Sequence, residues 1–224
     1  MTNGEGDTVV KIRGESLWLL PERAAFWEKL KLLLVADAHF GKAATFRAAG
    51  IPVPGGTTDN ALDRLKALVS RTSARGVVFL GDFLHAREGR SQGIVDGLRK
   101  WREDHSDLDL TLVRGNHDRH AGDPPDELNV KCANGPWLLP PFALTHHPRK
   151  SEEGYVIAGH VHPAVRLHDK GRQHLRLPCF IVGDSTMVLP AFGDFTGLGD
   201  VEPAESDQVF VVSGDSVLQI TRAP

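Results

Sequence analysis

Five short apolar runs, each followed closely by acidic, amide or imidazole side chains, constrain this chain more than any other feature of its sequence. Each run has the length and residue types of a buried β-strand. The runs are residues 32–36, 77–80, 110–114, 142–145 and 155–158. The side chains that follow them are Asp37, His39, Asp82, Asn116, His117, Asp118, His146, His147, His160 and His162. Functional groups gather at the carboxyl ends of strands in open α/β sheets, so neighbouring strands would bring these side chains to one place.

Two helical segments separate the first three runs. One apolar stripe covers residues 61–69, with Thr58 or Asp59 as its cap and Gly76 as its end, and a second covers residues 94–101. This strand–helix–strand alternation predicts an α/β fold that begins with parallel strands. The later runs have no helix between them, so we expect antiparallel additions and a second sheet.

The last part of the chain predicts a long surface loop over residues 193–207 and a closing hairpin from 210–212 to 216–220. The length of 224 residues fits a single domain covering residues 1–224. No apolar run approaches the ~18 residues that a membrane span needs. The polar, acidic first seven residues lack the order of a signal peptide, so we expect a soluble, cytoplasmic protein.

The strand ends carry the donors of a metal centre. Cys132 and Cys179 are far apart in the sequence, so any metal must be held by oxygen and imidazole. Two cations ~3.5–4 Å apart hydrolyse a phosphoester well, because they polarise the phosphate and lower the pKa of a water. We therefore expect a two-metal phosphoesterase, with Asp82 as the carboxylate that bridges both ions. Oxygen and imidazole donors suit Mn, Fe or Zn better than calcium. The expected ligands are Asp37, His39, Asp82, Asn116, His146 or His147, His160 and His162.

Further roles are expected for four residues, His160, His162, His117 and Asp118. His160 and His162 would point to the same side of an extended segment, since side chains alternate along a strand. His117 is not needed to complete the ligand set, and its place beside Asn116 would set it over the substrate phosphate. We expect His117 to be a general acid that protonates the leaving oxygen, with Asp118 orienting its ring. The alternative is a hydrogen bond of His117 within its own loop.

The five motifs resemble those of the binuclear metallophosphoesterase (calcineurin-like) superfamily. The resemblance implies a four-layer αββα sandwich, with two mixed β-sheets face to face, helices outside and the dimetal site at strand carboxyl ends. It implies one metal among Asp37, His39, Asp82 and His162. It implies a second metal among Asp82, Asn116, His146 and His160. In this family the ligand directly follows its strand, so the resemblance favours His146 over His147.

Longer strings resemble one branch of that superfamily, the ligase-associated DNA-damage-response endonucleases. The strings are residues 37–54, 81–87, 145–149 and 189–197. The resemblance implies a manganese-dependent nuclease that cuts single-stranded DNA, including flaps, gaps and bulges. It also implies a role in DNA repair together with a helicase, an exonuclease and a ligase. Leu198, after Gly197, departs from the two glycines frequent in that branch.

Basic and aromatic residues on the loops after the strands are compatible with DNA binding. The net charge of −3 argues against a broadly basic surface but allows a local basic lining. Phe40 or Phe46 could stack on an unpaired base, and each could equally be a core aromatic. His85 is expected either to contact the scissile or a flanking phosphate or to make a structural hydrogen bond. The basic residues are Lys42, Arg47, Arg87, Arg119, Arg149 and Lys150, of which we expect Arg47, Arg87 and Arg149 to bind substrate.

Three other functions remain open from the sequence. A hydrolase for a small nucleotide or lipid pyrophosphate would use the same metals in a closed pocket rather than an open basic groove. A protein phosphatase would prefer phosphomonoesters. A scaffold that had lost catalysis would usually lack several ligands, and here the whole set is present.

Overall fold

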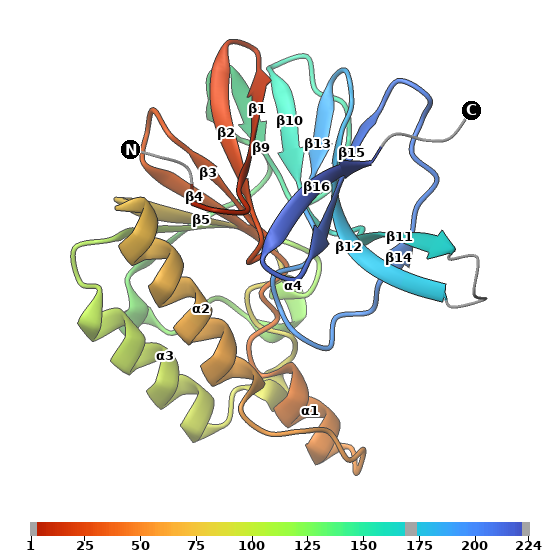
Figure 1. Ribbon diagram of the computed structural model, residues 1–224. Coiled ribbons are helices and arrows are strands. Elements are labelled where there is room, and N and C mark those ends of the chain that lie inside the picture. The colour runs from red at the N-terminus through yellow and green to blue at the C-terminus, as the bar shows by residue number, and fades with distance from the viewer. Residues whose placement is uncertain (1–3, 169–173, 221–224) are drawn as a thin grey trace.

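The computed structural model of the protein describes residues 4–168 and 174–220. Two β-sheets stack against each other, and the long helices cover the first sheet on the side away from the second (Figure 1). The sequence expectation of an α/β sandwich with two mixed sheets is confirmed. The helices of the described residues all fall between residues 42 and 128. No helix in residues 4–168 or 174–220 is both long and apolar enough to span a bilayer.

The first sheet has the strand order β1-β2-β3-β4-β5-β6-β7, antiparallel from β1 to β4 and parallel from β4 to β7. Its strands are β1 (Thr8–Ile12), β2 (Glu15–Leu20), β3 (Ala24–Trp27), β4 (Leu32–Ala36), β5 (Gly76–Leu80), β6 (Asp109–Val113) and β7 (Val130–Ala133). Ala36 pairs with Leu80, and Leu80 pairs with Val113. The three expected parallel strands therefore end level, and the residues after them start from one edge.

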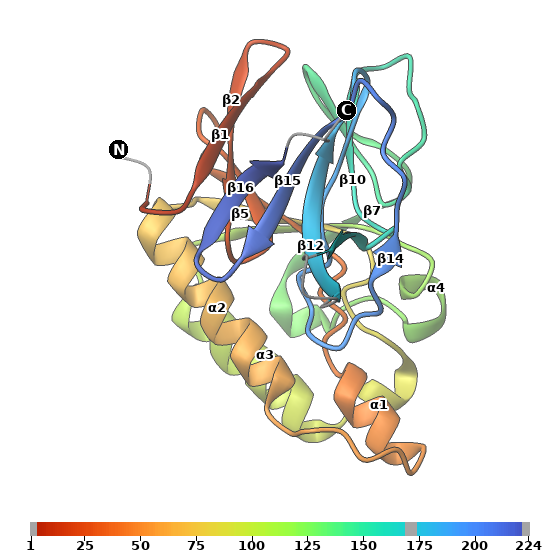
Figure 2. The same cartoon turned by 45° about the vertical axis from the view of Figure 1, so that its right-hand side comes forward.

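The helices follow the parallel strands. They are α1 (Lys42–Ala48), α2 (Thr57–Thr72), η1 (Arg87–Gly89), α3 (Gln92–Asp104), α4 (Asp118–Ala121) and η2 (Asp126–Leu128). α2 and α3 were expected, but the boundary residues of the first were wrong. Gly56 caps α2, Ser73 in a left-handed conformation ends it, and Gly76 already belongs to β5. α1 stands at the lower end of the molecule, apart from α2 and α3 (Figure 2).

The second sheet has the order β14-β11-β12-β13-β10-β9-β8, and β15 joins it by pairing with β12 and β16. Its strands are β8 (Trp137–Leu139), β9 (Phe142–Leu144), β10 (Tyr155–Ala158), β11 (Pro163–His168), β12 (His174–Val182), β13 (Thr186–Val188), β14 (Gly199–Asp200), β15 (Gln208–Ser213) and β16 (Ser216–Ile220). β10 runs parallel to β9 and β13, whereas β12 is antiparallel to its neighbours. The closing hairpin is confirmed as β15 and β16.

The core has two main layers because side chains alternate along each strand. Leu33 and Val35 of β4 face the helices, while Leu34 and Ala36 face the second sheet. Cys179 is fully buried in a smaller cluster of the second sheet, as its apolar surroundings in the sequence predict. The inter-sheet layer fixes the two sheets against each other and thereby aligns their strand ends.

Candidate metal centre

The structure brings the seven expected ligand residues together from both sheets. The first sheet supplies three short segments and the second sheet supplies two. Asp37 and His39 follow β4, Asp82 follows β5, Asn116 follows β6, His146 follows β9, and His160 and His162 follow β10. Four groups of acidic and imidazole side chains there have ligand atoms within 4.8 Å of one another.

Asp82 occupies the middle of this cluster. Its Oδ2 atom lies 3.8 Å from His39 Nε2 and 3.6 Å from His146 Nε2, so it faces imidazoles from both sheets. Its Oδ1 atom accepts a hydrogen bond of 2.9 Å from the backbone N–H of His117. Burial raises the pKa of the Asp82 carboxyl and lowers the pKa of the His39 imidazole. A cation between the two would favour the carboxylate and the neutral ring, which are the ligand forms.

Asp37, His39 and His162 form one side of the cluster. Asp37 Oδ1 and His162 Nε2 lie 3.6 Å apart, and neither buried atom has a hydrogen-bond partner among the described residues. His162 Nδ1 donates to the Gly197 carbonyl at 3.0 Å, which leaves Nε2 as the basic nitrogen. Two ligands that each lie ~2.1 Å from one ion are separated by up to ~4.2 Å. A divalent cation between these atoms would satisfy both.

His146 forms the other side of the cluster. Its Nε2 atom lies 2.9 Å from Asn116 Oδ1 and 3.0 Å from His160 Nδ1. Its Nδ1 atom donates to the Leu80 carbonyl at 2.9 Å, so Nε2 is again the basic nitrogen. His146 is almost fully buried, whereas His147 is half-buried and packs its ring 4.2 Å from that of His160. Of the adjacent pair, His146 is the residue that meets Asn116. The oxygen and imidazole donors on both sides fit a divalent metal site.

The backbone of the cluster is strained at five of the seven positions that carry the expected donors. Positive φ is uncommon outside glycine and costs free energy. Because His160 and His162 both adopt it, their segment turns, and the extended segment on which their expected shared side depended is not formed. Gly159 is required beside them, since a Cβ there would lie 2.5 Å from Asp37 Oδ2. The positive φ angles are 53° at Asp37, 46° at His39, 51° at Asp82, 72° at His160 and 50° at His162.

His117 and His85 lie beside the cluster as an aromatic pair. Their rings stack with centroids 5.0 Å apart and an angle of 23°, and the His117 ring lies 5.0 Å from that of His39. His117 Nδ1 donates to the His85 carbonyl at 2.8 Å. His85 Nδ1 lies 3.3 Å from His39 Nδ1, and burial lowers the pKa of His85 to about 4. His85 is therefore a neutral ring at pH 7 that contacts an expected ligand.

The expected role of Asp118 is wrong. Its Oδ2 accepts hydrogen bonds from the backbone N–H groups of Asp82 at 2.8 Å and Gly115 at 2.7 Å. Its Oδ1 accepts one from Phe83 at 3.0 Å. Both oxygens are used, and the His85 carbonyl rather than Asp118 orients the His117 ring. Asp118 instead ties the loop after β6 to the loop after β5.

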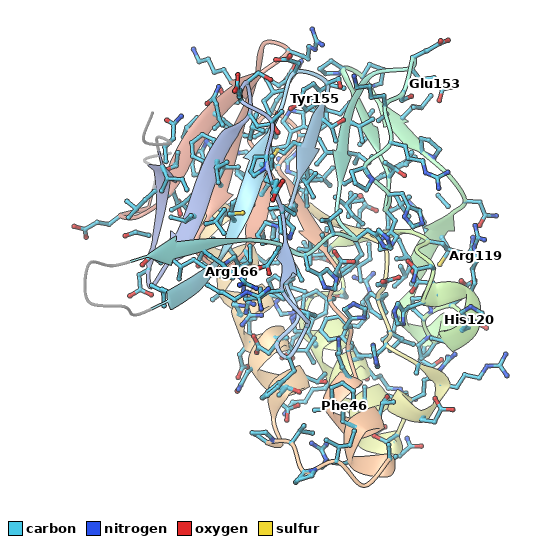
Figure 3. All side chains as sticks on the ribbon, turned by 90° about the vertical axis from the view of Figure 1, so that its right-hand side faces the viewer. Phe46, Arg119, His120, Glu153, Tyr155 and Arg166 are labelled. Atoms are coloured by element: carbon cyan, nitrogen blue, oxygen red, sulfur yellow. The ribbon has the colours of Figure 1, made fainter. Side chains whose placement is uncertain are left out.

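The three arginines expected to bind substrate are exposed and make no ion pair or hydrogen bond to an expected ligand within residues 4–168 and 174–220. Arg47 donates to the Pro54 carbonyl at 3.1 Å, and Arg87 donates to the His120 carbonyl at 2.9 Å. Arg149 lies two residues after His147. Figure 3 shows Arg119 and His120 on α4 at one side of the molecule and Phe46 on α1 at its lower end.

The two aromatic residues considered for base stacking differ in their burial. Phe40 is fully buried against Phe79 and Phe83, so it is a core residue and is excluded from base stacking. Phe46 is half-buried and its ring lies 6.0 Å from that of His85.

The sequence does not predict the Leu80 and Gly197 carbonyls, which fix the tautomers of His146 and His162. Every residue has a backbone carbonyl, so residue types do not show which carbonyl accepts a hydrogen bond.

Comparison with solved structures finds close similarity to a nuclease. The chain is 40% identical to Pseudomonas putida nuclease MPE, over 96% of this chain and 100% of that chain, with a TM-score of 0.85. It is 16% identical to YfcE, a phosphoesterase from E. coli, over 84% of this chain and 97% of that chain, with a TM-score of 0.43. No family model and no curated protein matches the chain.

Proposed function

Because this chain belongs to the metallophosphoesterase family of nucleases and is a metal-dependent phosphodiesterase, we propose that it is a manganese-dependent endonuclease of single-stranded DNA. The proposed substrates include flaps, gaps and bulges. One observation carries the proposal: a protein whose whole length aligns with this chain at 40% identity is a nuclease.

The donor set supports a pair of ions. Asp37, His39, Asp82 and His162 would hold one ion. Asp82, Asn116, His146 and His160 would hold the other. When bound, such a pair polarises the phosphate and lowers the pKa of a water molecule. Asp82 is suited to both ions because its free Oδ2 atom faces one imidazole of each set.

His117 supplies the proton in this proposal. Its Nδ1–H is held by the His85 carbonyl, which leaves Nε2 free to carry a proton to the leaving oxygen. The stacked His85 ring limits how far the His117 ring can turn. His85 itself lies close enough to His39 to contact a phosphate oxygen at the metal centre.

Exposure of the centre and the charge around it support a polymeric substrate. Asn116, His117 and His162 are half-buried and His160 is exposed, so the donors are accessible from outside. The exposed Arg47, Arg87 and Arg149 would bind phosphates along the strand. The resemblance to ligase-associated endonucleases supports a place in DNA repair beside a helicase, an exonuclease and a ligase.

The test is cleavage of labelled single-stranded, duplex and flap DNA with added metals, run beside a generic aryl phosphodiester. We expect internal cuts in unpaired DNA that require manganese and disappear in Asn116→Ala. Hydrolysis of the aryl ester with intact DNA would instead indicate a small substrate, such as a nucleotide or lipid pyrophosphate.

A second measurement tests the acid. His117→Gln should keep both metals and slow the hydrolysis of esters with poor leaving groups by ~10²–10⁴. Esters with good leaving groups should be affected much less, because they need no proton. Loss of metal from the variant would contradict the assignment.

A further inference from the structure

Lys42 is a half-buried lysine beside the candidate metal centre. It is the first residue of α1, and its backbone N–H donates to the His39 carbonyl at 3.1 Å. Its Nζ atom lies 5.9 Å from the centre of the Phe46 ring. Within residues 4–168 and 174–220 the ammonium makes no hydrogen bond and no ion pair.

The ammonium lies on the His39 side of the centre, because Lys42 follows His39 by three residues and its Nζ atom lies over the Phe46 ring, which packs beside His85. Burial lowers the pKa of Lys42, while the carboxylates of Asp82 and Asp37 oppose that shift. The charge of Lys42 in turn contributes to the lowered pKa values of His39 and His85. These effects agree with the position of Lys42 beside Phe46 and three residues after His39.

α1 holds this side chain in place. Lys42 and Phe46 are four residues apart and therefore share one face of the helix. Phe46 in turn packs its ring 6.0 Å from that of His85. The backbone of α1 is fixed as well, because the Gly41 N–H donates to Thr58 Oγ1 on α2 at 3.1 Å. Lys42, Phe46 and His85 thus form a continuous wall on the His39 side of the centre, which we call the α1 wall.

Charge balance favours an anion as the partner of Lys42. Only two of the seven expected ligands are carboxylates, so two divalent cations would leave the centre positive. Asp37 and Asp82 would then be neutralised by the ions, and a half-buried ammonium beside them would need another anion. We propose that Lys42 is a substrate-binding residue that donates a hydrogen bond to a non-bridging oxygen of the phosphodiester at the metal centre. The proposal rests on the proposed phosphodiesterase function and names a contact that this function requires.

The test compares Lys42→Ala and Lys42→Arg with the wild-type chain and with Lys66→Ala, an exposed helical lysine away from the centre. Three quantities are measured: bound manganese, kcat/KM for an aryl phosphodiester and for single-stranded DNA, and the inhibition constant of inorganic phosphate. We expect Lys42→Ala to keep its manganese, lose roughly 10–100-fold in kcat/KM on both substrates and bind phosphate about tenfold more weakly. Lys42→Arg should recover part of each loss, and Lys66→Ala should behave as wild type.

Unchanged kcat/KM and phosphate inhibition in Lys42→Ala would overturn the proposal. Loss of manganese would overturn it too, since Lys42 would then support the ligands rather than the substrate. The DNA proposal can fail separately: wild-type protein that hydrolyses the aryl ester and leaves DNA intact would refute DNA cleavage. The kcat/KM of the Lys42 variants for the aryl ester and their inhibition by phosphate would still show whether Lys42 binds substrate.

Discussion

The ring of His146 fills the space that a side chain on Gly81 would occupy. Gly81 has a φ of 81°, and a Cβ on it would collide with the imidazole. Gly81 stands between the end of β5 and Asp82 in the first sheet, while His146 comes from the second sheet. The glycine therefore allows a donor from one sheet to reach the donors of the other.

Gly81→Ala should disrupt the metal centre without unfolding the protein. The methyl group would displace the His146 ring from Asn116 and Asp82, so bound metal should fall and kcat/KM should drop by about 10²-fold or more. Metal content and aryl-ester hydrolysis, measured on the same preparation, would show this. Gly14→Ala is the matched control, because Gly14 has a similar φ of 85° and a Cβ there meets open space. Normal metal content in Gly81→Ala would contradict the steric argument.

Asp118→Ala should mainly lower the free energy of unfolding, and its effect on proton transfer should be secondary. It would leave three buried backbone N–H groups without their acceptor, and hydrogen bonds to charged groups are worth ~1.5–3 kcal/mol each. We expect the free energy of unfolding in urea to fall by more than about 3 kcal/mol. Asp118→Asn, which keeps one acceptor oxygen, should fall less. The exposed Asp63→Ala should stay within about 0.5 kcal/mol of wild type.

Ionisation of Tyr155 lowers the stability of the folded protein at alkaline pH, and absorbance can follow that ionisation. Its hydroxyl donates to the Gly183 carbonyl at 2.7 Å, and burial raises its pKa to about 12. The unfolded chain ionises at ~10, so the stability linked to this group is complete below that pH and is lost as pH rises toward 12.

Tyr155 is the single tyrosine of the chain, so phenolate absorbance reports it alone. The native protein should show no phenolate at pH values where the same protein in guanidinium is already ionised. Tyr155→Phe should lack the part of the alkaline destabilisation that comes from this group. Ionisation of the native protein near the ordinary tyrosine pKa would refute the burial argument.

His162→Gly should be more stable than His162→Ala. Both variants lack the imidazole, and they differ in how well they tolerate the φ of 50° at this position. Alanine there costs ~1–2 kcal/mol, which exceeds the ~0.5–1 kcal/mol that glycine loses through its more flexible unfolded chain. Urea unfolding should therefore favour the glycine variant by up to about 1 kcal/mol. The same pair at Gln219, in the middle of β16, should show the opposite order.

The sequence predicts the elements that are strongly apolar and regular. The runs that became β4, β5, β6, β9 and β10 stand out because each is buried on both faces, which gives continuous apolar residues. α2 and α3 stand out because each covers the sheet with one stripe. Their exact ends depend on caps such as Gly56, which were not recognised.

β2 and β3 were not predicted, although residues 17–20 and 24–27 are also continuous, buried apolar runs. β1 to β3 carry no polar residue of chemical interest at their ends, so they were not noticed. α1 has seven residues, no side-chain cap and no long stripe. An isolated helix of that length is unstable in water, so packing against the rest of the protein decides that it forms.

The clustering of the seven expected ligand residues could be predicted, because each follows an apolar strand and the ends of neighbouring strands meet at one edge. The role of Asp118 could not, because adjacency to His117 says nothing about where a carboxylate points. α4 begins at Asp118, and the turn of the chain there directs the carboxylate toward the amides of the loop after β5. The orientation of His117 depends on a backbone carbonyl 32 residues away, which only the fold brings near.

The left-handed backbone at five expected ligands has an evolutionary consequence. In a lineage that stopped using the metals, glycine at these positions would relieve the backbone strain without the loss of a working donor. This chain keeps aspartate and histidine at all five strained positions. Aspartate and histidine at positions that favour glycine argue against a descendant that survives only as a scaffold.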